Sequence, residues 1–170
     1  LHRNRRSLCL DLKTEAGRNT FLELVAVADV VIENFSARAM PSMGLDFATL
    51  CAANPRIVYL SMPGYGAQGP YKDRVAFGPV IEPMCGLTSV LGYGPDEPRN
   101  SAIALMDPFA ATHAVGAVCA ALRERDENDT SVQVELSLHE GGVALCGPWL
   151  IDRQLGAEQT CLLYTSDAAD

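Results

Sequence analysis

The stretch Asp29-Val30-Val31-Ile32-Glu33-Asn34 decides the fold that the sequence predicts, because it joins a short β-branched run to a polar exit. Such a run is typical of a parallel strand buried between helices, and it predicts one over Val30 to Glu33. Before it, Thr14 precedes apolar residues at helical spacing, which predicts a capped helix ending near Ala28. The strand and this helix form the first unit of an alternating pattern.

The pattern continues on both sides of this unit. Ser7 to Leu12 alternates and predicts an opening strand, and Ser36 to Met43 predicts a helical turn broken by Pro41. Asp46 is then expected to cap a short helix that ends before Pro55, and Arg56 to Met62 predicts another strand. Short links between alternating strands and helices predict a doubly wound, mostly parallel, Rossmann-like α/β sheet.

The second half of the chain predicts further elements of the same kind. A helix is expected over Phe77 to Leu91, with Pro83 as a kink, and a long helix rich in small residues over Pro108 to Arg125. Val132 to Ser137 alternates as a strand, and Leu138 to about Leu155 predicts a final helix. Glu82 is interpreted as a solvated position of the first of these helices.

Composition limits the class of protein. The chain has 170 residues, 48% of them hydrophobic and 20% charged, with a net charge of −8 that argues against a nucleic-acid surface. No apolar run reaches the roughly 18 to 20 residues of a membrane span, and no secretory signal pattern opens the chain, so we expect a cytoplasmic protein.

Cysteine spacing argues against a metal site. Six cysteines include no C-x-x-C pair, and the three histidines do not cluster with them. Five of the cysteines lie in apolar sequence surroundings and are interpreted as reduced thiols in the core: Cys9, Cys51, Cys85, Cys119 and Cys146.

The last ten residues differ in character from the rest. Residues 161–170 resemble the translation of a sequencing adaptor, so we expect them to be non-native and exclude them from the fold. The remaining residues, 1–160, are then expected to form one incomplete domain, cut from within a longer chain.

Asp107 stands between a short apolar run and the long helix, and it admits two interpretations. Its side chain could cap the free N–H groups of that helix, with Pro108 at the first helical position. Alternatively, it is a catalytic carboxylate kept ionised by the positive end of the helix dipole.

Glycines follow the strand that ends near Met62. Gly64-Tyr65-Gly66-Ala67-Gln68-Gly69 fits G-x-G-x-x-G, which in a dinucleotide site opens a helix and precedes an acidic residue about 20 positions on. Here Pro70-Tyr71-Lys72-Asp73 follows, no helix opens cleanly, and the acidic residue is missing. A turn-rich loop that needs glycine conformations is therefore the simpler interpretation.

Seven segments form a larger pattern along residues 4 to 156: Leu10-Asp11-Leu12-Lys13-Thr14-Glu15-Ala16-Gly17-Arg18, Ala28-Asp29-Val30-Val31-Ile32-Glu33-Asn34-Phe35, Met43-Gly44-Leu45, Asn54-Pro55-Arg56-Ile57-Val58-Tyr59, Gly64-Tyr65-Gly66 with Gly69-Pro70-Tyr71, Met84-Cys85-Gly86-Leu87, and the Asp107 helix. In this order they resemble the family III CoA-transferases, the group that includes formyl-CoA and carnitine-CoA transferases. The resemblance implies the large domain of such an enzyme, whose members form interlocked homodimers.

The resemblance also implies site residues. Asn34 and Phe35 would contact coenzyme A from the loop after their strand, and Lys13 would meet a phosphate. Further contacts would come from Leu10, Met43, Met62 and Leu138. Without the resemblance these residues would be interpreted as a loop cap, core packing and a solvated lysine.

The reaction implied is covalent transfer of CoA from an acyl-CoA to a carboxylic acid, with no permanently bound cofactor. Asp107 would be the nucleophile, and Gly64 and Gly66 would let backbone approach the acyl group. A related alternative is an α-methylacyl-CoA racemase, but its histidine position matches Phe77 here, and neither His113 nor His139 replaces it. A third alternative is an inactive piece that only binds CoA.

Overall fold

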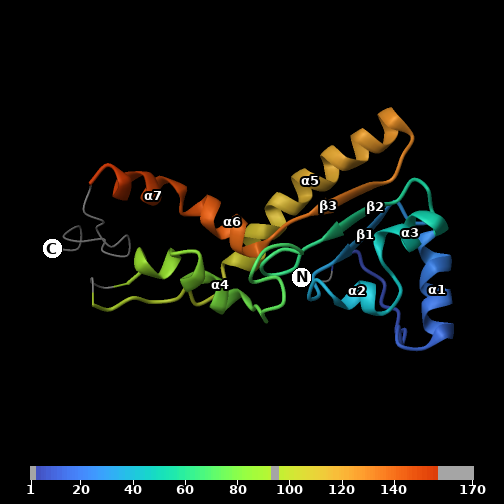
Figure 1. The fold of residues 1–170 in the computed structure, drawn as a ribbon, viewed down its shortest axis with the longest axis horizontal. Helices are drawn as coiled ribbons and strands as arrows, with labels where there is room; N and C mark the ends of the chain where they lie inside the picture. Colours follow the sequence, from blue (N-terminus) through green and yellow to red (C-terminus); the bar gives the residue numbers. More distant parts are fainter. Residues whose placement is uncertain (1–2, 93–95, 157–170) are drawn as a thin grey trace.

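A computed structural model describes residues 3–92 and 96–156, which are built around a three-stranded parallel sheet (Figure 1). Strands β1 (Val30–Glu33), β2 (Val58–Ser61) and β3 (Val132–Glu135) lie in the order β1-β2-β3. Val58 pairs with Val30 on one side and Val132 on the other. The structure therefore confirms the parallel α/β sheet predicted from the sequence.

The face of the sheet that carries Tyr59 is covered by the N-terminal helices. These are α1 (Glu15–Val25), the short α2 (Ala39–Ser42) that contains Pro41, and α3 (Phe47–Ala53). Tyr59 packs with Val25, Leu50 and Ile57 in one core cluster. The two predicted caps are confirmed, since the Thr14 side chain accepts from Gly17 N and Asp46 accepts from Thr49 N.

The opposite face of the sheet is covered by α5 (Met106–Asn128), which packs along β2 and β3. Val58 and Leu60 of β2 are both 0% exposed. Their neighbours in β3, Val132 and Val134, are half-buried, whereas the alternate β3 residues are exposed. Alanines of α5 are buried, so the helix approaches the strands closely: Ala110, Ala114 and Ala121.

A second core cluster lies beyond the carboxyl ends of the strands. It joins the start of α5 to α4 (Gly78–Met84), to the 3₁₀ helix η1 (Leu87–Ser89) and to α6 (Leu138–Leu145), which leads into α7 (Gly147–Gln154). Gly142 of α6 makes this packing possible, because a Cβ atom there would lie 2.7 Å from Met106 Sδ.

Two long helices predicted from the sequence are each divided. The one expected over Phe77 to Leu91 ends at Met84, because Gly86 adopts a φ of 91° and reverses the chain before η1. The one expected over Leu138 to Leu155 divides at Cys146, where Gly147 and Pro148 begin α7. Apolar periodicity continued across both breaks, so the single-helix predictions were wrong.

Two strand predictions also need correction. Ser7 to Leu12 is extended but is not a strand, because none of the described residues pairs with it. β1 is parallel as predicted but is not fully buried, since it lies at the edge of the sheet and leaves Ile32 60% exposed. A β-branched run therefore marked the strand correctly but not its place in the sheet.

The predicted burial of the cysteines is right for two residues and wrong for two. Cys85 and Cys146 are buried, whereas Cys9 and Cys119 are exposed and Cys51 is intermediate. Cys119 lies on the solvent side of α5, where apolar neighbours along the chain face other directions. All five are free thiols.

Two further hydrogen bonds connect separate parts of the chain before and at the end of α5. Between η1 and α5, Arg99 N donates to Leu91 O at 2.9 Å, beside a bridge between Gly92 and Pro98. At the far end of α5, Arg125 Nη1 donates to Asp29 Oδ1 at 2.9 Å.

None of the helices in the described ranges is long and apolar enough to cross a membrane. The expected non-native segment, residues 161–170, lies outside the described residues.

Candidate active site

Asp107 is the second residue of α5, not its cap. The helix begins at Met106 with Leu105 as N-cap, and Phe109 N already donates to Leu105 O at 3.1 Å. The capping interpretation was therefore wrong, as was Pro108 at the first helical position. The chain turns into the helix earlier than the sequence suggested because Ala104 takes a left-handed φ of 48°.

The Asp107 carboxylate is open to solvent on one side and lies against α4 on the other. A Cβ atom on Gly78 would lie 2.9 Å from Asp107 Oδ2, so the carboxylate rests on bare backbone. Partial desolvation, and then the negative charge of Glu82, raise the pKa of Asp107 above its usual value. Among the described residues, none donates a hydrogen bond to this carboxylate, so its oxygens remain available.

Glu82 contradicts the solvated position predicted for it, because its side chain is 0% exposed. Its Oε2 accepts from Ser101 N at 2.7 Å, while Oε1 accepts from Ser101 Oγ at 2.6 Å and from Leu105 N at 2.8 Å. Glu82 thus supplies, from α4, the acceptor that a capping side chain would provide at the start of α5. The sequence gave no sign of this because helical periodicity does not show which polar residue meets donors from a distant loop.

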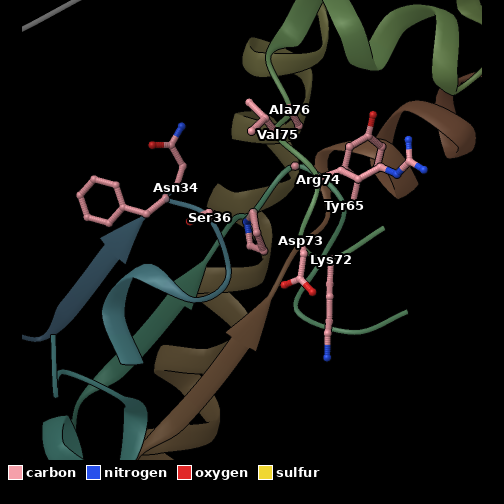
Figure 2. Close-up of a pocket in the computed structure, with 11 residues that line it drawn as sticks. Asn34, Ser36, Tyr65, Lys72, Asp73, Arg74, Val75 and Ala76 are labelled. Carbon is pink, nitrogen blue, oxygen red and sulfur yellow. The ribbon is translucent and has the colours of Figure 1, made fainter. Parts of the chain in front are cut away.

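A cavity of about 270 Å³ opens at the carboxyl ends of β1 and β2 (Figure 2). Its lining comes from the loop after β1, the start of the glycine loop and the segment before α4: Asn34, Phe35, Ser36, Pro63, Gly64, Tyr65, Lys72, Asp73, Arg74, Val75 and Ala76. The structure therefore brings together three residues predicted separately, Asn34, Phe35 and Gly64. The carboxyl edge of a parallel sheet is where ligands bind in such folds.

The cavity has a polar side that the sequence did not single out. Asp73 pairs with Arg38, and the Arg74 guanidinium lies 4.6 Å from the Tyr71 ring centre. In the described part of the chain no ion pair engages Lys72. Lys72 and Arg74 are two basic residues close together in a loop that follows a strand. This pattern in the sequence could have indicated that they line a binding cavity.

The two glycines predicted to approach the substrate occupy different surroundings. A Cβ atom on Gly64 would lie 2.1 Å from Ala76 Cβ, so this glycine lets the loop pack against the segment that leads into α4. Gly66 has a φ of 79° and faces Glu135, whose carboxylate accepts from Ala67 N. Gly64 therefore packs against Ala76 and the Ile81 side chain of α4, whereas Gly66 secures the turn toward β3.

The other predicted contact residues lie apart from this cavity. Lys13 is exposed beside the cap of α1, and Leu10 is half-buried in the extended segment before it. Met43 is half-buried at the end of α2. Met62 and Leu138 pack in the second core cluster, with Leu138 8% exposed.

The two histidines in the described ranges, His113 and His139, make contacts with groups other than Asp107. His113 is exposed on α5 and packs on Phe109, with 4.6 Å between ring centres. His139 Nε2 lies 3.1 Å from Met84 O, and its ring contacts Tyr65. Phe77, at the position that a racemase histidine would take, is 68% exposed just before α4. Within the described ranges, no three His, Cys, Asp or Glu side chains are grouped to hold a metal ion.

Comparison with known proteins identifies the family. The model for "CoA-transferase family III" matches residues 1–161. This chain belongs to CoA-transferase family III. Curated relatives of the family III chain include formyl-CoA:oxalate CoA-transferase of Streptomyces avermitilis, 34% identical over 98% of the chain and 41% of the relative. Succinyl-CoA–D-citramalate CoA-transferase of Chloroflexus aurantiacus is 32% identical over 91% of the chain and 39% of the relative.

Solved structures agree with this family assignment. A CaiB/BaiF family protein from Brucella suis matches with a TM-score of 0.85 at 31% identity, covering 92% of the family III chain and 41% of the neighbour. A protein from Mycobacterium tuberculosis matches with a TM-score of 0.83 at 28% identity, over 90% of the chain and 43% of the neighbour. The chain thus spans about two-fifths of the length of these relatives.

Proposed function

We propose that the complete gene product transfers CoA from an acyl-CoA thioester to a carboxylic acid and that Asp107 is its nucleophile. The observation that carries this proposal is the state of the Asp107 carboxylate. It is exposed, it accepts no hydrogen bond from the described residues, and it stands on the first turn of α5, whose dipole favours an anion there.

The reaction proceeds in four displacements at carbonyl carbons. In each displacement one anion attacks the carbonyl carbon and another anion leaves it. The Asp107 carboxylate attacks the donor thioester, and breaking of the C–S bond gives a mixed anhydride and CoA thiolate. The thiolate attacks the aspartyl carbonyl, which releases the donor acid and leaves an aspartyl-CoA thioester. The acceptor carboxylate expels CoA thiolate from this thioester, and the thiolate then takes the acceptor acyl group and frees Asp107.

The surroundings of Asp107 suit these steps. The backbone N–H groups at the N-terminus of α5 favour negative charge on developing oxyanions. Gly64 brings the loop after β2 close to the segment before α4. The cavity at the ends of β1 and β2 would then hold part of coenzyme A, with Phe35 as an apolar surface and Lys72 near phosphate oxygens.

The remaining assignments follow from the family. CoA and acyl-CoA act as substrates, and no cofactor is bound permanently. We expect the complete protein to be a cytoplasmic, interlocked homodimer and residues 161–170 to be non-native. On this view the chain alone is inactive, because its relatives are more than twice as long.

The test is to trap the acylated aspartate in the complete protein. Incubation with an acyl-CoA and hydroxylamine, followed by peptide mass spectrometry, should place a hydroxamate on Asp107, and Asp107→Ala should lose both the adduct and turnover, by roughly 10³-fold or more. Substantial turnover in Asp107→Ala would remove Asp107 from this role.

The same incubation in deuterated water separates transfer from isomerisation. A transferase leaves the α-carbon of the acyl group unlabelled, because no step removes that proton. Deuterium at the α-carbon without a hydroxamate would replace the transferase proposal by proton transfer of the racemase type.

A further inference from the structure

Glu82 is a buried acid that the displacement steps do not use. Its carboxylate accepts three hydrogen bonds, two of them from backbone N–H groups at Ser101 and Leu105. These residues bracket the turn into α5, and Leu105 is the N-cap of that helix. One side chain of α4 therefore holds both ends of the segment that delivers Asp107.

The segment that Glu82 holds is strained. Ala104 has a φ of 48°, a left-handed conformation that is unfavourable for a residue with a Cβ atom. A Cβ atom on Gly78 would also lie only 2.8 Å from Ala104 Cβ, so α4 and the turn are in close contact. Such a turn persists only where its surroundings fix it.

We propose that Glu82 is a positioning residue for the nucleophile: by binding Ser101 and Leu105 it holds the strained turn at Ala104, and so places the Asp107 carboxylate against Gly78. This inference rests on the proposed function, because it concerns the group assigned there as the nucleophile. Glu82 itself does not touch the reacting atoms.

A carboxylate suits this task better than its amide isostere. Glutamine offers a single acceptor oxygen, so in Glu82→Gln the amide NH₂ must face either Ser101 N–H or Leu105 N–H, and one of them loses its bond to residue 82. Leu105 N would keep Ser101 Oγ, 3.2 Å away, as a partner, whereas Ser101 N would have lost its side-chain acceptor. Either loss weakens the hold on the strained turn. The turn is then expected to relax and carry Asp107 with it.

Other titratable groups lie on or against α4. The helices packed against α4 bring Asp107 from α5 and His139 from α6, whose Nε2 meets Met84 O. The Cys85 thiol of α4 itself donates to Glu82 O at 3.2 Å. Among the described residues, the side chains of Asp107, His139 and Cys85 form no hydrogen bond with the turn, whereas Glu82 accepts three from Ser101 and Leu105.

The experiment compares Glu82→Gln with wild-type in the complete protein, with Glu124→Gln as the matched control on the exposed side of α5. We expect kcat of Glu82→Gln to fall by about 10- to 100-fold, while KM for acyl-CoA changes little. The acidic limb of the pH profile should move to lower pH, because the charge that raises the pKa of Asp107 is gone.

A second variant tests the link through the turn. Glycine adopts the left-handed conformation without strain, so Ala104→Gly added to Glu82→Gln should restore part of the lost kcat. A role of Glu82 in stability alone predicts a lower fraction of active protein, an unchanged kcat per active molecule and no rescue by Ala104→Gly, and that result would overturn the inference.

Trapping with hydroxylamine keeps the two proposals apart. If wild-type protein carries the adduct on Asp107 and Glu82→Gln matches it in kcat, the positioning role is wrong and the proposed function stands. If wild-type protein carries no adduct on Asp107, the proposed function fails and the positioning role falls with it.

Discussion

A Cβ atom on Gly78 would lie 2.9 Å from Asp107 Oδ2 and 3.1 Å from Asp107 Cγ, so the position of the carboxylate depends on a missing side chain. A Cβ contact of 2.9 Å is too short to persist, so one of the two partners would have to move. This close approach places the first residue of α4 against the first turn of α5. A side chain added at Gly78 therefore tests the position of Asp107.

Gly78→Ala should displace Asp107 or Ala104 and lower kcat by roughly 10- to 100-fold, because a misplacement of about 1 Å is sufficient for a loss of that size. Gly116→Ala is the matched control, since nothing lies within 4 Å of a Cβ atom there and alanine favours a helix interior by about 1 kcal/mol. Steady-state kinetics and urea unfolding of both variants provide the measurement. Equal activity of the two variants would contradict this geometry.

The contact between Gly64 and Ala76 predicts a compensating pair. Gly64→Ala would bring two Cβ atoms to 2.1 Å and should destabilise the protein by about 1–3 kcal/mol. Ala76→Gly removes the opposing atom, so the double variant should recover most of this loss. A double-mutant cycle measured by urea unfolding should therefore give a coupling energy well above about 0.5 kcal/mol, whereas additive effects would exclude the contact.

The raised pKa of Asp107 has a consequence for stability. An acid whose pKa is higher in the folded than in the unfolded protein contributes stability below its unfolded pKa and loses it as pH rises through the folded pKa. At neutral pH the ionised Asp107 is therefore unfavourable, and Asp107→Asn should raise the free energy of unfolding.

This gain from Asp107→Asn should shrink as the pH falls toward the unfolded value of about 3.9, where the wild-type carboxyl is neutral as well. Urea unfolding at a series of pH values measures the difference between the two proteins. A gain that does not change with pH would show that packing, rather than ionisation, sets the effect.

Local signals predicted the N-terminal half of the fold well. Thr14 and Asp46 lie at the helix starts where their side chains were expected, and Val30 to Glu33 matches β1 residue for residue. These features depend on neighbours within a few positions along the chain, which is why the sequence was sufficient. The edge position of β1 depends on the whole sheet, and it was missed.

For the candidate site, the sequence supplied residues but not geometry. Asp107, Gly64, Asn34 and Phe35 came from the resemblance, and the capping role of Asp107 was wrong because α5 begins one residue before it, after the left-handed Ala104. Glu82 and Ser101 meet only through folding, and periodicity cannot show such a pair. The same limit applies to Lys72, whose relation to the cavity depends on how the glycine loop folds back.

The hydrogen bond from Arg99 N to Leu91 O closes the connection between η1 and α5 at its base, while Ser101 beyond it is bound to α4. The proposed nucleophile, Asp107, is therefore held by contacts with α4 and not by the path of this connection. Insertions, deletions and substitutions between Leu91 and Arg99 would leave Asp107 in place. Variation in the length and sequence of this connection is therefore compatible with an unchanged position of the Asp107 carboxylate.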